Sequence, residues 1–205
     1  KPVVLVLTGG SPIELQWAHE NTPAIVMMWY PGEEGGNALA DVLFGKVNPS
    51  GRLPMTFVAS ADQLPPFEDY QMAGRTYRFM SAEPQYPFGY GLSYTTFSYD
   101  GLCVTPVDTP THFSVTARVT NVGDVSGDEV AQLYIRDPEA SVPVPLRHLE
   151  GIQRVHLAPG ETATVEFTIG PDQLACFDDD GSAFVEPGTF EITVGGRQPD
   201  VRDDL

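Results

Sequence analysis

The chain has 205 residues, enough for one or two domains, and its 41% hydrophobic content is typical of a folded globular protein. Its formal net charge is −17, from 28 acidic and 11 basic side chains, and a field of this sign repels nucleic-acid phosphates and anionic lipids. We therefore expect a neutral substrate or partner, and we expect the chain to bind neither nucleic acid nor membrane. Because no run of about 18 apolar residues occurs, we also expect no membrane-spanning helix.

The N-terminal part predicts two parallel strands, each followed by a helix. Residues 3–7 and 24–29 are continuous apolar runs, typical of strands buried on both faces of a parallel sheet. A first helix is expected after Ser11, which forms a capping-box pattern with Glu14, and a second over residues 37–44. The β-α-β-α order fits right-handed crossovers. Since two strands do not make a stable sheet, we expect the chain to be the tail of a larger enzyme.

The next segment, which ends at about residue 92, is rich in proline and aromatic residues. Prolines prevent long elements here, whereas a flexible linker would be small and polar. We therefore expect an ordered linker, anchored on a domain surface by its rings. These rings are Phe67, Tyr70, Tyr77, Phe79, Tyr86, Phe88 and Tyr90.

From about residue 93 the hydrophobic period changes to two. Residues 113–120 alternate apolar and polar side chains, which predicts a half-buried strand. About seven short strands at near-regular spacing favour an antiparallel β-sandwich. Both tryptophans, Trp17 and Trp29, precede this region, so a fibronectin type III-like sandwich fits better than an antibody domain. Further strands are expected at residues 130–135, 152–157, 163–169, 184–185 and 190–194.

The two cysteines, Cys103 and Cys176, lie far apart, and the chain contains no CxxC motif. They are either free core residues or a single bridge. We favour free thiols, because neither cysteine belongs to a disulfide-dense framework.

Glu33 and Glu34 are the most obvious pair of carboxylates. Adjacent side chains diverge, whereas the two carboxyl groups of a glycosidase flank one bond at about 5 to 9 Å. Both glutamates also precede the second predicted helix, where negative charge offsets the helix dipole. We interpret them as helix-start residues.

Other candidate sites have equally plain structural interpretations. The turn Gly9-Gly10-Ser11 lacks the spacing of phosphate-binding loops. The segment Cys176–Gly181 looks partly like a calcium loop but lacks the charged ligands at both ends, so we interpret it as a hairpin tip. The histidines show no zinc-site spacing, and no G-x-S-x-G motif occurs. We predict no catalytic, cofactor-binding or metal-binding residue. The histidines are His19, His112, His148 and His156.

Motifs along essentially the whole chain resemble the C-terminal part of glycoside hydrolase family 3. The run Asp69–Tyr77, followed by Tyr86-Pro-Phe-Gly-Tyr-Gly, is most similar to the β-xylosidase and related β-glucosidase members. In chain order, the motifs are Thr8-Gly-Gly-Ser-Pro12, Pro23-Ala-Ile-Val26, Trp29-Tyr-Pro-Gly-Glu-Glu-Gly-Gly36, Ala40-Asp-Val-Leu-Phe-Gly45, Asn48-Pro-Ser-Gly-Arg-Leu-Pro54, Gly74-Arg-Thr-Tyr-Arg78, Tyr86-Pro-Phe-Gly-Tyr-Gly-Leu-Ser-Tyr94, Val119-Thr-Asn-Val-Gly-Asp124, Glu129-Val-Ala-Gln-Leu-Tyr134 and Leu157-Ala-Pro-Gly-Glu161.

The resemblance implies a retaining, exo-acting β-glycosidase that hydrolyses terminal β-linked sugars of neutral oligosaccharides. Its aspartate nucleophile would lie on an N-terminal barrel and its glutamate acid/base in an upstream segment, and neither motif is present here. We therefore expect the isolated chain to be inactive. Its partner would be the missing barrel and α/β portion, in cis or as a separate chain. A periplasmic or extracellular location is also implied.

The resemblance divides the chain into three parts. Residues 1–60 would be the end of an α/β-sandwich domain, residues 61–92 the ordered linker, and residues 93–205 a fibronectin type III-like domain. A scaffold that supports the barrel and the α/β domain is the favoured local role. The alternative is a non-catalytic module whose sandwich binds carbohydrate or protein. The preference of the parent enzyme for glucose or xylose stays open.

Overall fold

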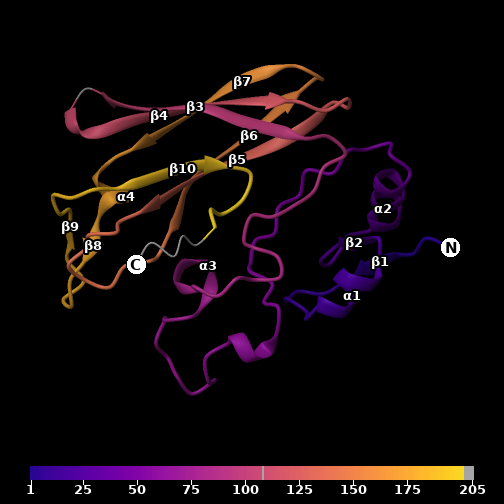
Figure 1. Ribbon diagram of the computed structural model, residues 1–205, viewed down its shortest axis with the longest axis horizontal. Helices are drawn as coiled ribbons and strands as arrows, with labels where there is room; N and C mark the ends of the chain where they lie inside the picture. Colours follow the sequence, from indigo (N-terminus) through magenta and orange to yellow (C-terminus); the bar gives the residue numbers. More distant parts are fainter. Residues whose placement is uncertain (108, 201–205) are drawn as a thin grey trace.

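The computed structural model describes residues 1–107 and 109–200, and it contains an α/β unit, a linker and a β-sandwich (Figure 1). The α/β unit has the order β1 (Val4–Leu7), α1 (Gln16–Asn21), β2 (Ala24–Met27) and α2 (Gly35–Leu43). Strands β1 and β2 pair in parallel. The predicted β-α-β-α order is therefore confirmed. No helix in the described parts of the chain is long and apolar enough to cross a bilayer.

Helix α1 begins at Gln16, so the prediction that Ser11 caps it was wrong. The residue before the helix, Leu15, makes no side-chain capping bond. Leu15 and Ala18 are instead buried together with Phe57. Packing of this apolar face fixes where the helix starts and overrides the capping pattern.

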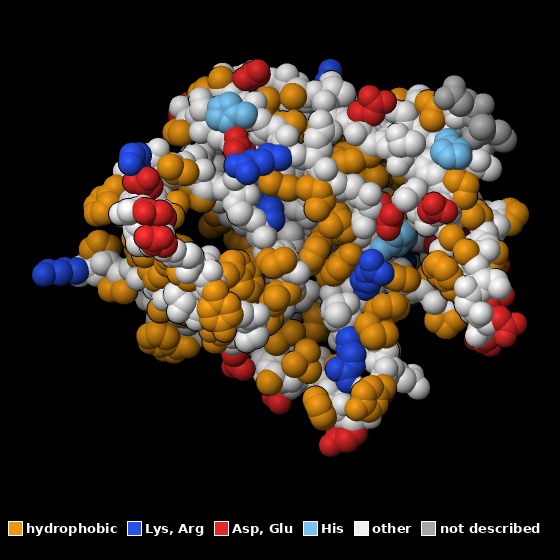
Figure 2. Space-filling model, turned by 180° about the vertical axis from the view of Figure 1, so that it is seen from behind, with side chains coloured by type: hydrophobic (Ala, Val, Ile, Leu, Met, Phe, Trp, Pro, Cys, Tyr) orange, Lys and Arg blue, Asp and Glu red, His pale blue; other side chains and the backbone are white. Residues whose placement is uncertain are grey.

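The two-stranded sheet is only partly covered. Every residue of β1 and β2 is half-buried or exposed, although the apolar runs predict burial on both faces. Hydrophobic side chains gather over the side of the molecule that carries this unit (Figure 2). Leu5, Leu7 and Ile25 pack against the cluster of Leu15, Ala18 and Phe57, but the rest of the sheet lacks the covering layers that a parallel sheet usually has.

The linker is ordered and contains two short helical turns, η1 (Ala61–Gln63) and α3 (Thr76–Phe79). Tyr77 lies edge-on to Tyr134 of the sandwich, with a centroid separation of 6.2 Å, and Tyr86 lies edge-on to Phe57 of the α/β unit at 6.4 Å. These rings confirm the prediction of aromatic anchors. For Phe67 and Tyr70 the prediction was wrong, because both side chains are almost fully exposed.

The sandwich consists of two three-stranded antiparallel sheets and a small hairpin (Figure 1). One sheet has the order β3-β4-β7 and the other β10-β5-β6, while β8 pairs with β9. The strands are β3 (Phe97–Val107), β4 (Thr109–Asn121), β5 (Gly127–Arg136), β6 (His148–Leu157), β7 (Thr162–Ile169), β8 (Cys176–Phe177), β9 (Ala183–Phe184) and β10 (Glu191–Gly195), with the short helix α4 (Pro171–Leu174) after β7.

Strands β3 and β8 were not among the predicted ones. Gly101 and Pro106 interrupt the sequence of β3, and both positions coincide with irregular pairing to β4. Gly101 has a φ of 65°, inside the register shift between Asp100 and Cys103. Because β3 is an edge strand, a bulge and a proline are tolerated there.

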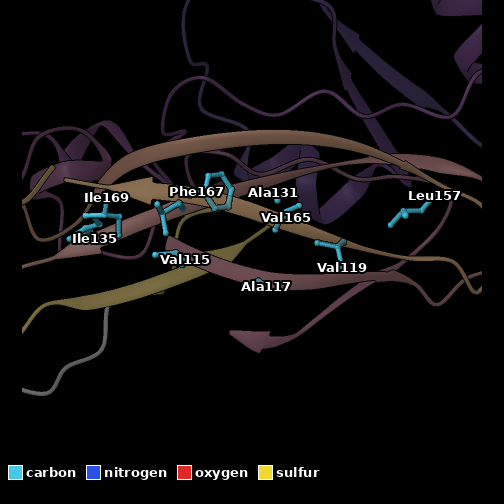
Figure 3. Packing of buried hydrophobic residues seen from close by; sticks show 10 residues of the cluster. Val115, Ala117, Val119, Ala131, Ile135, Leu157, Val165, Phe167 and Ile169 are labelled. Carbon is cyan, nitrogen blue, oxygen red and sulfur yellow. The ribbon is translucent and has the colours of Figure 1, made fainter. Parts of the chain in front are cut away.

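The core of the sandwich lies between its two sheets (Figure 3). Val115, Ala117 and Val119 of β4 point into it, which confirms the predicted alternation. Burial of one valine, leucine or isoleucine side chain contributes about 1.5 to 3 kcal/mol, so this cluster is the main source of stability. The cluster comprises Val115, Ala117, Val119, Ala131, Leu133, Ile135, Leu157, Val165, Phe167 and Ile169.

Both cysteines are free thiols, as predicted. Cys103 is exposed on β3, whereas Cys176 is buried on β8. Burial raises the pKa of the Cys176 thiol, and the neighbouring carboxylates of Asp137 and Glu186 raise it further.

Candidate functional site

The carboxylates singled out in the sequence lie at the surface. Glu33 and Glu34 are both exposed, and Glu34 directly precedes α2. The Asn37 side chain donates a hydrogen bond to the Glu34 carboxylate. This position supports the interpretation of the pair as helix-start residues.

The four histidines lie on α1, β4 and the two ends of β6, and each has its own neighbour. The Nδ1 atom of His19 lies 2.9 Å from the Tyr86 hydroxyl, and that of His148 lies 2.7 Å from Glu150. His112 lies beside Thr111. In residues 1–107 and 109–200, no group of three or more His, Cys, Asp or Glu side chains could hold a metal ion.

His156 belongs to a small surface cluster with Asp128. Its Nδ1 atom lies 2.6 Å from one carboxylate oxygen of Asp128, and Arg154 donates to the other. The hydrogen bond from His156, and then those from Arg154, lower the pKa of Asp128. Arg154 also donates to the Ser50 hydroxyl at 3.0 Å, so this cluster reaches from the sandwich to the segment after α2.

The two candidate loops have structural roles. The backbone N–H of Gly9 donates to the Trp29 carbonyl, which joins the ends of β1 and β2. In the segment Cys176–Gly181, one Asp178 oxygen accepts the backbone N–H groups of Asp180 and Ser182. This carboxylate thus closes the tip of the β8–β9 hairpin, as interpreted from the sequence.

A polar network lies where the segment after α2 and the linker meet the sandwich, and we call it the junction. Its centre is a buried ion pair between Arg52 and Glu129, with 2.8 Å between Nη2 and Oε2 and only 10% and 5% of the side chains exposed. The Tyr99 hydroxyl donates to the other Glu129 oxygen at 3.0 Å. Burial, and then the Glu129 charge, raise the pKa of Tyr99. This phenol therefore stays protonated and keeps donating.

Asn48 forms the second part of the junction. Its Oδ1 accepts the Ser93 hydroxyl at 2.9 Å and the Tyr94 backbone N–H at 2.8 Å. Its Nδ2 donates to the Ser126 carbonyl at 3.1 Å. The Tyr94 hydroxyl in turn donates to the Val42 carbonyl of α2. One amide therefore connects the α/β unit, the end of the linker and the sandwich.

The third part of the junction is the outer face of β5, which the linker covers. Gln132 is buried and donates to the carbonyls of Gly89 and Gly196, at 3.1 and 2.8 Å. It also accepts the Tyr134 hydroxyl at 2.6 Å. Tyr134 lies edge-on to Tyr77 of the linker. Strand β5 is thus buried on both faces, by the core on one side and by the linker on the other.

A cavity of about 440 Å³ lies beneath the linker, next to the junction. Its walls are mostly apolar, and none of them is aspartate, glutamate, histidine or cysteine. The buried hydroxyl of Thr56 has no hydrogen-bond partner in the described residues. The cavity lacks the paired carboxylates that glycoside hydrolysis requires. It is lined by Pro54, Met55, Thr56, Val58, Leu64, Met72, Thr76, Tyr77, Arg78, Met80 and Phe88.

Sequence reasoning assigned no role to Arg52, Asn48 or Gln132. A signal was present in β5, where Gln132 interrupts an apolar run and Glu129 directly precedes it. Buried polar side chains need partners, so polar residues inside a buried strand indicate contacts across a domain boundary. The identity of those partners depends on residues far away in the chain.

Comparison with known proteins places this arrangement in a family. Residues 1–94 match the glycosyl hydrolase family 3 C-terminal domain, and residues 129–198 match a fibronectin type III-like domain. The chain belongs to glycoside hydrolase family 3. This assignment confirms both the resemblance and the predicted two-part fold, an α/β fragment followed by a sandwich.

Two of the relatives are xylosidases. A β-xylosidase of Formosa agariphila is 44% identical over 100% of this chain and 29% of its own length. A xylan 1,4-β-xylosidase of Xylanibacter ruminicola is 43% identical over 95% of this chain and 22% of its own length.

Solved β-glucosidase structures show the same fold. A β-glucosidase from Erythrobacter marinus has a TM-score of 0.84 and 42% identity, covering 95% of this chain and 26% of that one. The β-glucosidase 3B of Thermotoga neapolitana has a TM-score of 0.88 and 35% identity, over 98% and 30%. The chain thus spans less than a third of the length of these relatives and is a C-terminal part of a larger enzyme.

Proposed function

We propose that this chain is the C-terminal portion of a retaining, exo-acting β-glucosidase or β-xylosidase, and that its own role is structural. The relatives named above are β-glucosidases and β-xylosidases, which supports the reaction class. A retaining enzyme needs two carboxyl groups about 5 Å apart across the scissile bond. We assign both to the part of the enzyme outside this chain. The substrate would be a neutral oligosaccharide, compatible with the net charge of −17.

The junction is the observation that carries the structural role. Its buried hydrogen bonds and ion pair connect the α/β unit, the linker and the sandwich, and directional bonds of this kind favour one relative orientation. The half-buried strands β1 and β2 then present an edge to the remaining strands of the enzyme's sheet and their apolar faces to its covering layers. That remaining part, a barrel with the rest of the α/β domain, is the proposed partner, in cis or as a separate chain.

An activity assay tests the proposal. The longer enzyme that contains this chain should release 4-nitrophenol from aryl β-xyloside or β-glucoside, whereas the 205-residue chain alone should not exceed the buffer rate. Release by the chain alone would overturn the structural role. Inactivity of the longer enzyme on both substrates would overturn the reaction class.

A periplasmic or extracellular location is part of the proposal. One relative, 40% identical over 95% of this chain, is a periplasmic β-glucosidase of Salmonella typhimurium. Fractionation of cells that express the longer enzyme should place its activity outside the cytoplasm, and recovery with a cytoplasmic marker would contradict this location.

A further inference from the structure

The linker carries an apolar surface in which two projecting rings lie beside a cavity. Phe67 is 88% exposed and Tyr70 is 89% exposed, on a loop whose residues 66–73 are all at the surface. Met72 of this loop and Leu64 before it line the cavity beneath the linker, and each is about half exposed, so the cavity opens next to the loop. We call these four side chains and the cavity the linker patch.

Hydrogen bonds within the loop hold its two rings in place. The half-buried Arg75 side chain donates to the carbonyls of Gln71, Pro66 and Asp69. The Asp69 backbone N–H closes a turn onto the Pro66 carbonyl at 3.0 Å. A surface that is ordered before it binds loses little conformational freedom on binding. The linker patch is thus preformed, although its rings are not held by burial in this chain.

The chemistry of the cavity fits an apolar protein side chain better than a sugar. None of the lining residues carries a carboxylate or an amide side chain. The hydroxyl of Thr76 accepts the Arg78 backbone N–H, that of Tyr77 accepts the Leu149 backbone N–H, and that of Thr56 is buried within the wall. A sugar would need several free polar groups to bind its hydroxyls. An apolar side chain needs none, and exposed aromatic rings and methionine are typical of protein interfaces.

The rest of the enzyme is the partner that this surface fits. The chain covers at most 30% of the length of the relatives compared above, so more than two thirds of each relative has no counterpart in it. The loop and the α/β unit both lie below the sandwich in Figure 1. The open sheet of the α/β unit is where we place the missing strands. Because both surfaces lie on the same side of the sandwich, one large partner reaches both.

We propose that the linker patch docks onto the part of the longer enzyme that precedes this chain. Phe67 and Tyr70 are the anchors that insert into that part, and the cavity receives one of its apolar side chains. The proposal rests on the structural role proposed above and deepens it, because it adds a second contact, through the linker, to the contact at β1 and β2. Two separate contacts would fix the orientation of the catalytic part relative to the sandwich.

Thermal unfolding of the longer enzyme tests this contact. The variant Phe67→Ala/Tyr70→Ala loses few contacts within this chain, since both rings are almost fully exposed in it. A loss of stability therefore reports contacts with the rest of the enzyme, and the midpoint should fall by about 3 °C or more. The control Phe177→Ala removes a ring on β8 that is 63% exposed and should leave the midpoint unchanged.

Hydroxyl-radical footprinting of the wild-type longer enzyme tests the same contact without any substitution. Phe67 and Phe177 are the same residue type, and Phe67 is the more exposed of the two in this chain. If the patch is docked, oxidation of Phe67 should be slower than oxidation of Phe177. The opposite order would show that Phe67 stays in water and would overturn the proposal.

Three outcomes for the double alanine variant of the longer enzyme would also overturn it. The first is an unchanged midpoint. The second is an unchanged midpoint that no longer rises when xylose or glucose is added, which would make the patch a sugar site. The third is a change from dimer to monomer in analytical ultracentrifugation, which would make it a contact between copies. None of these measurements depends on hydrolysis, so failure of the docking proposal and failure of the glycosidase assay are distinguishable.

Discussion

Replacing Arg52 with methionine is the most direct perturbation of the junction. The change keeps most of the side-chain length but leaves the Glu129 carboxylate, which is 5% exposed, without its cationic partner. Removal of one member of a buried ion pair typically destabilises a protein by about 3 to 5 kcal/mol, because the other charge stays buried and uncompensated. Two features place the destabilisation expected for Arg52→Met at the lower end of that range. The Tyr99 hydroxyl still donates to Glu129, and the Arg52 Nε atom is already buried without a partner.

A double-mutant cycle isolates the ion pair. Arg52→Met and Glu129→Gln should each lower the free energy of unfolding by about 3 kcal/mol, since each leaves one buried charge. The double variant buries no unpaired charge and should therefore lose less than either single variant, and far less than the sum of the two losses. Arg118→Met, which breaks an exposed pair with Asp100, is the matched control and should lose less than about 1 kcal/mol.

Urea unfolding followed by two probes measures both the loss and its location. Trp17 and Trp29 both lie in the α/β unit, so their fluorescence reports that unit, whereas far-UV circular dichroism is dominated by the strands of the sandwich. The two transitions should coincide in the wild type and separate in the Arg52→Met variant. Strictly additive single losses, or a loss in Arg52→Met no larger than in Arg118→Met, would refute this account of the junction.

Three further perturbations test other parts of the fold. Asn121→Ala removes a fully buried amide that makes four hydrogen bonds and should lower the free energy of unfolding by about 3 kcal/mol in urea; a loss below about 1 kcal/mol would contradict this. Asp128→Asn should reduce the thermal midpoint at pH 6. Because the folded pKa of Asp128 is lowered, chiefly by His156, its stabilising effect is lost as pH falls through that pKa, so the deficit should shrink toward pH 3, and a constant deficit would contradict the linkage. Ellman's reagent should titrate Cys103 rapidly in the native chain and Cys176 only after denaturation, and two fast thiols would contradict the burial of Cys176.

The elements that follow from local patterns were predictable from the sequence. Strand β4 shows a period of two and β1 is an unbroken apolar run, and both lie close to where these patterns place them. Strand β3 was not predictable in this way, because its bulge at Gly101 and its proline break the alternation. Only pairing with β4 makes that segment a strand, and the pairing partner is not a local property.

The junction was the least predictable part of the chain. The motif that contains Asn48 and Arg52 is visible in the sequence, but its partners lie more than 40 residues away along the chain. For Phe67 and Tyr70 the difficulty was of another kind. We expected aromatic residues in this proline-rich segment to be anchors. The loop is instead ordered by hydrogen bonds from Arg75 to backbone carbonyls, and these bonds exist only in the folded loop.

The burial of β5 on both faces makes the linker part of the sandwich. The core side chains Ala131, Leu133 and Ile135 cover one face, and Gln132 and Tyr134 bind the linker on the other. Removing the linker would expose a buried glutamine and a buried tyrosine, so the linker and the sandwich should fold together. The α/β unit differs, because its strands stay half-exposed and its attachment depends on the polar contacts of the junction. Stability is therefore concentrated in the sandwich and the linker, while the α/β unit is held in place with its apolar faces open to the rest of the enzyme.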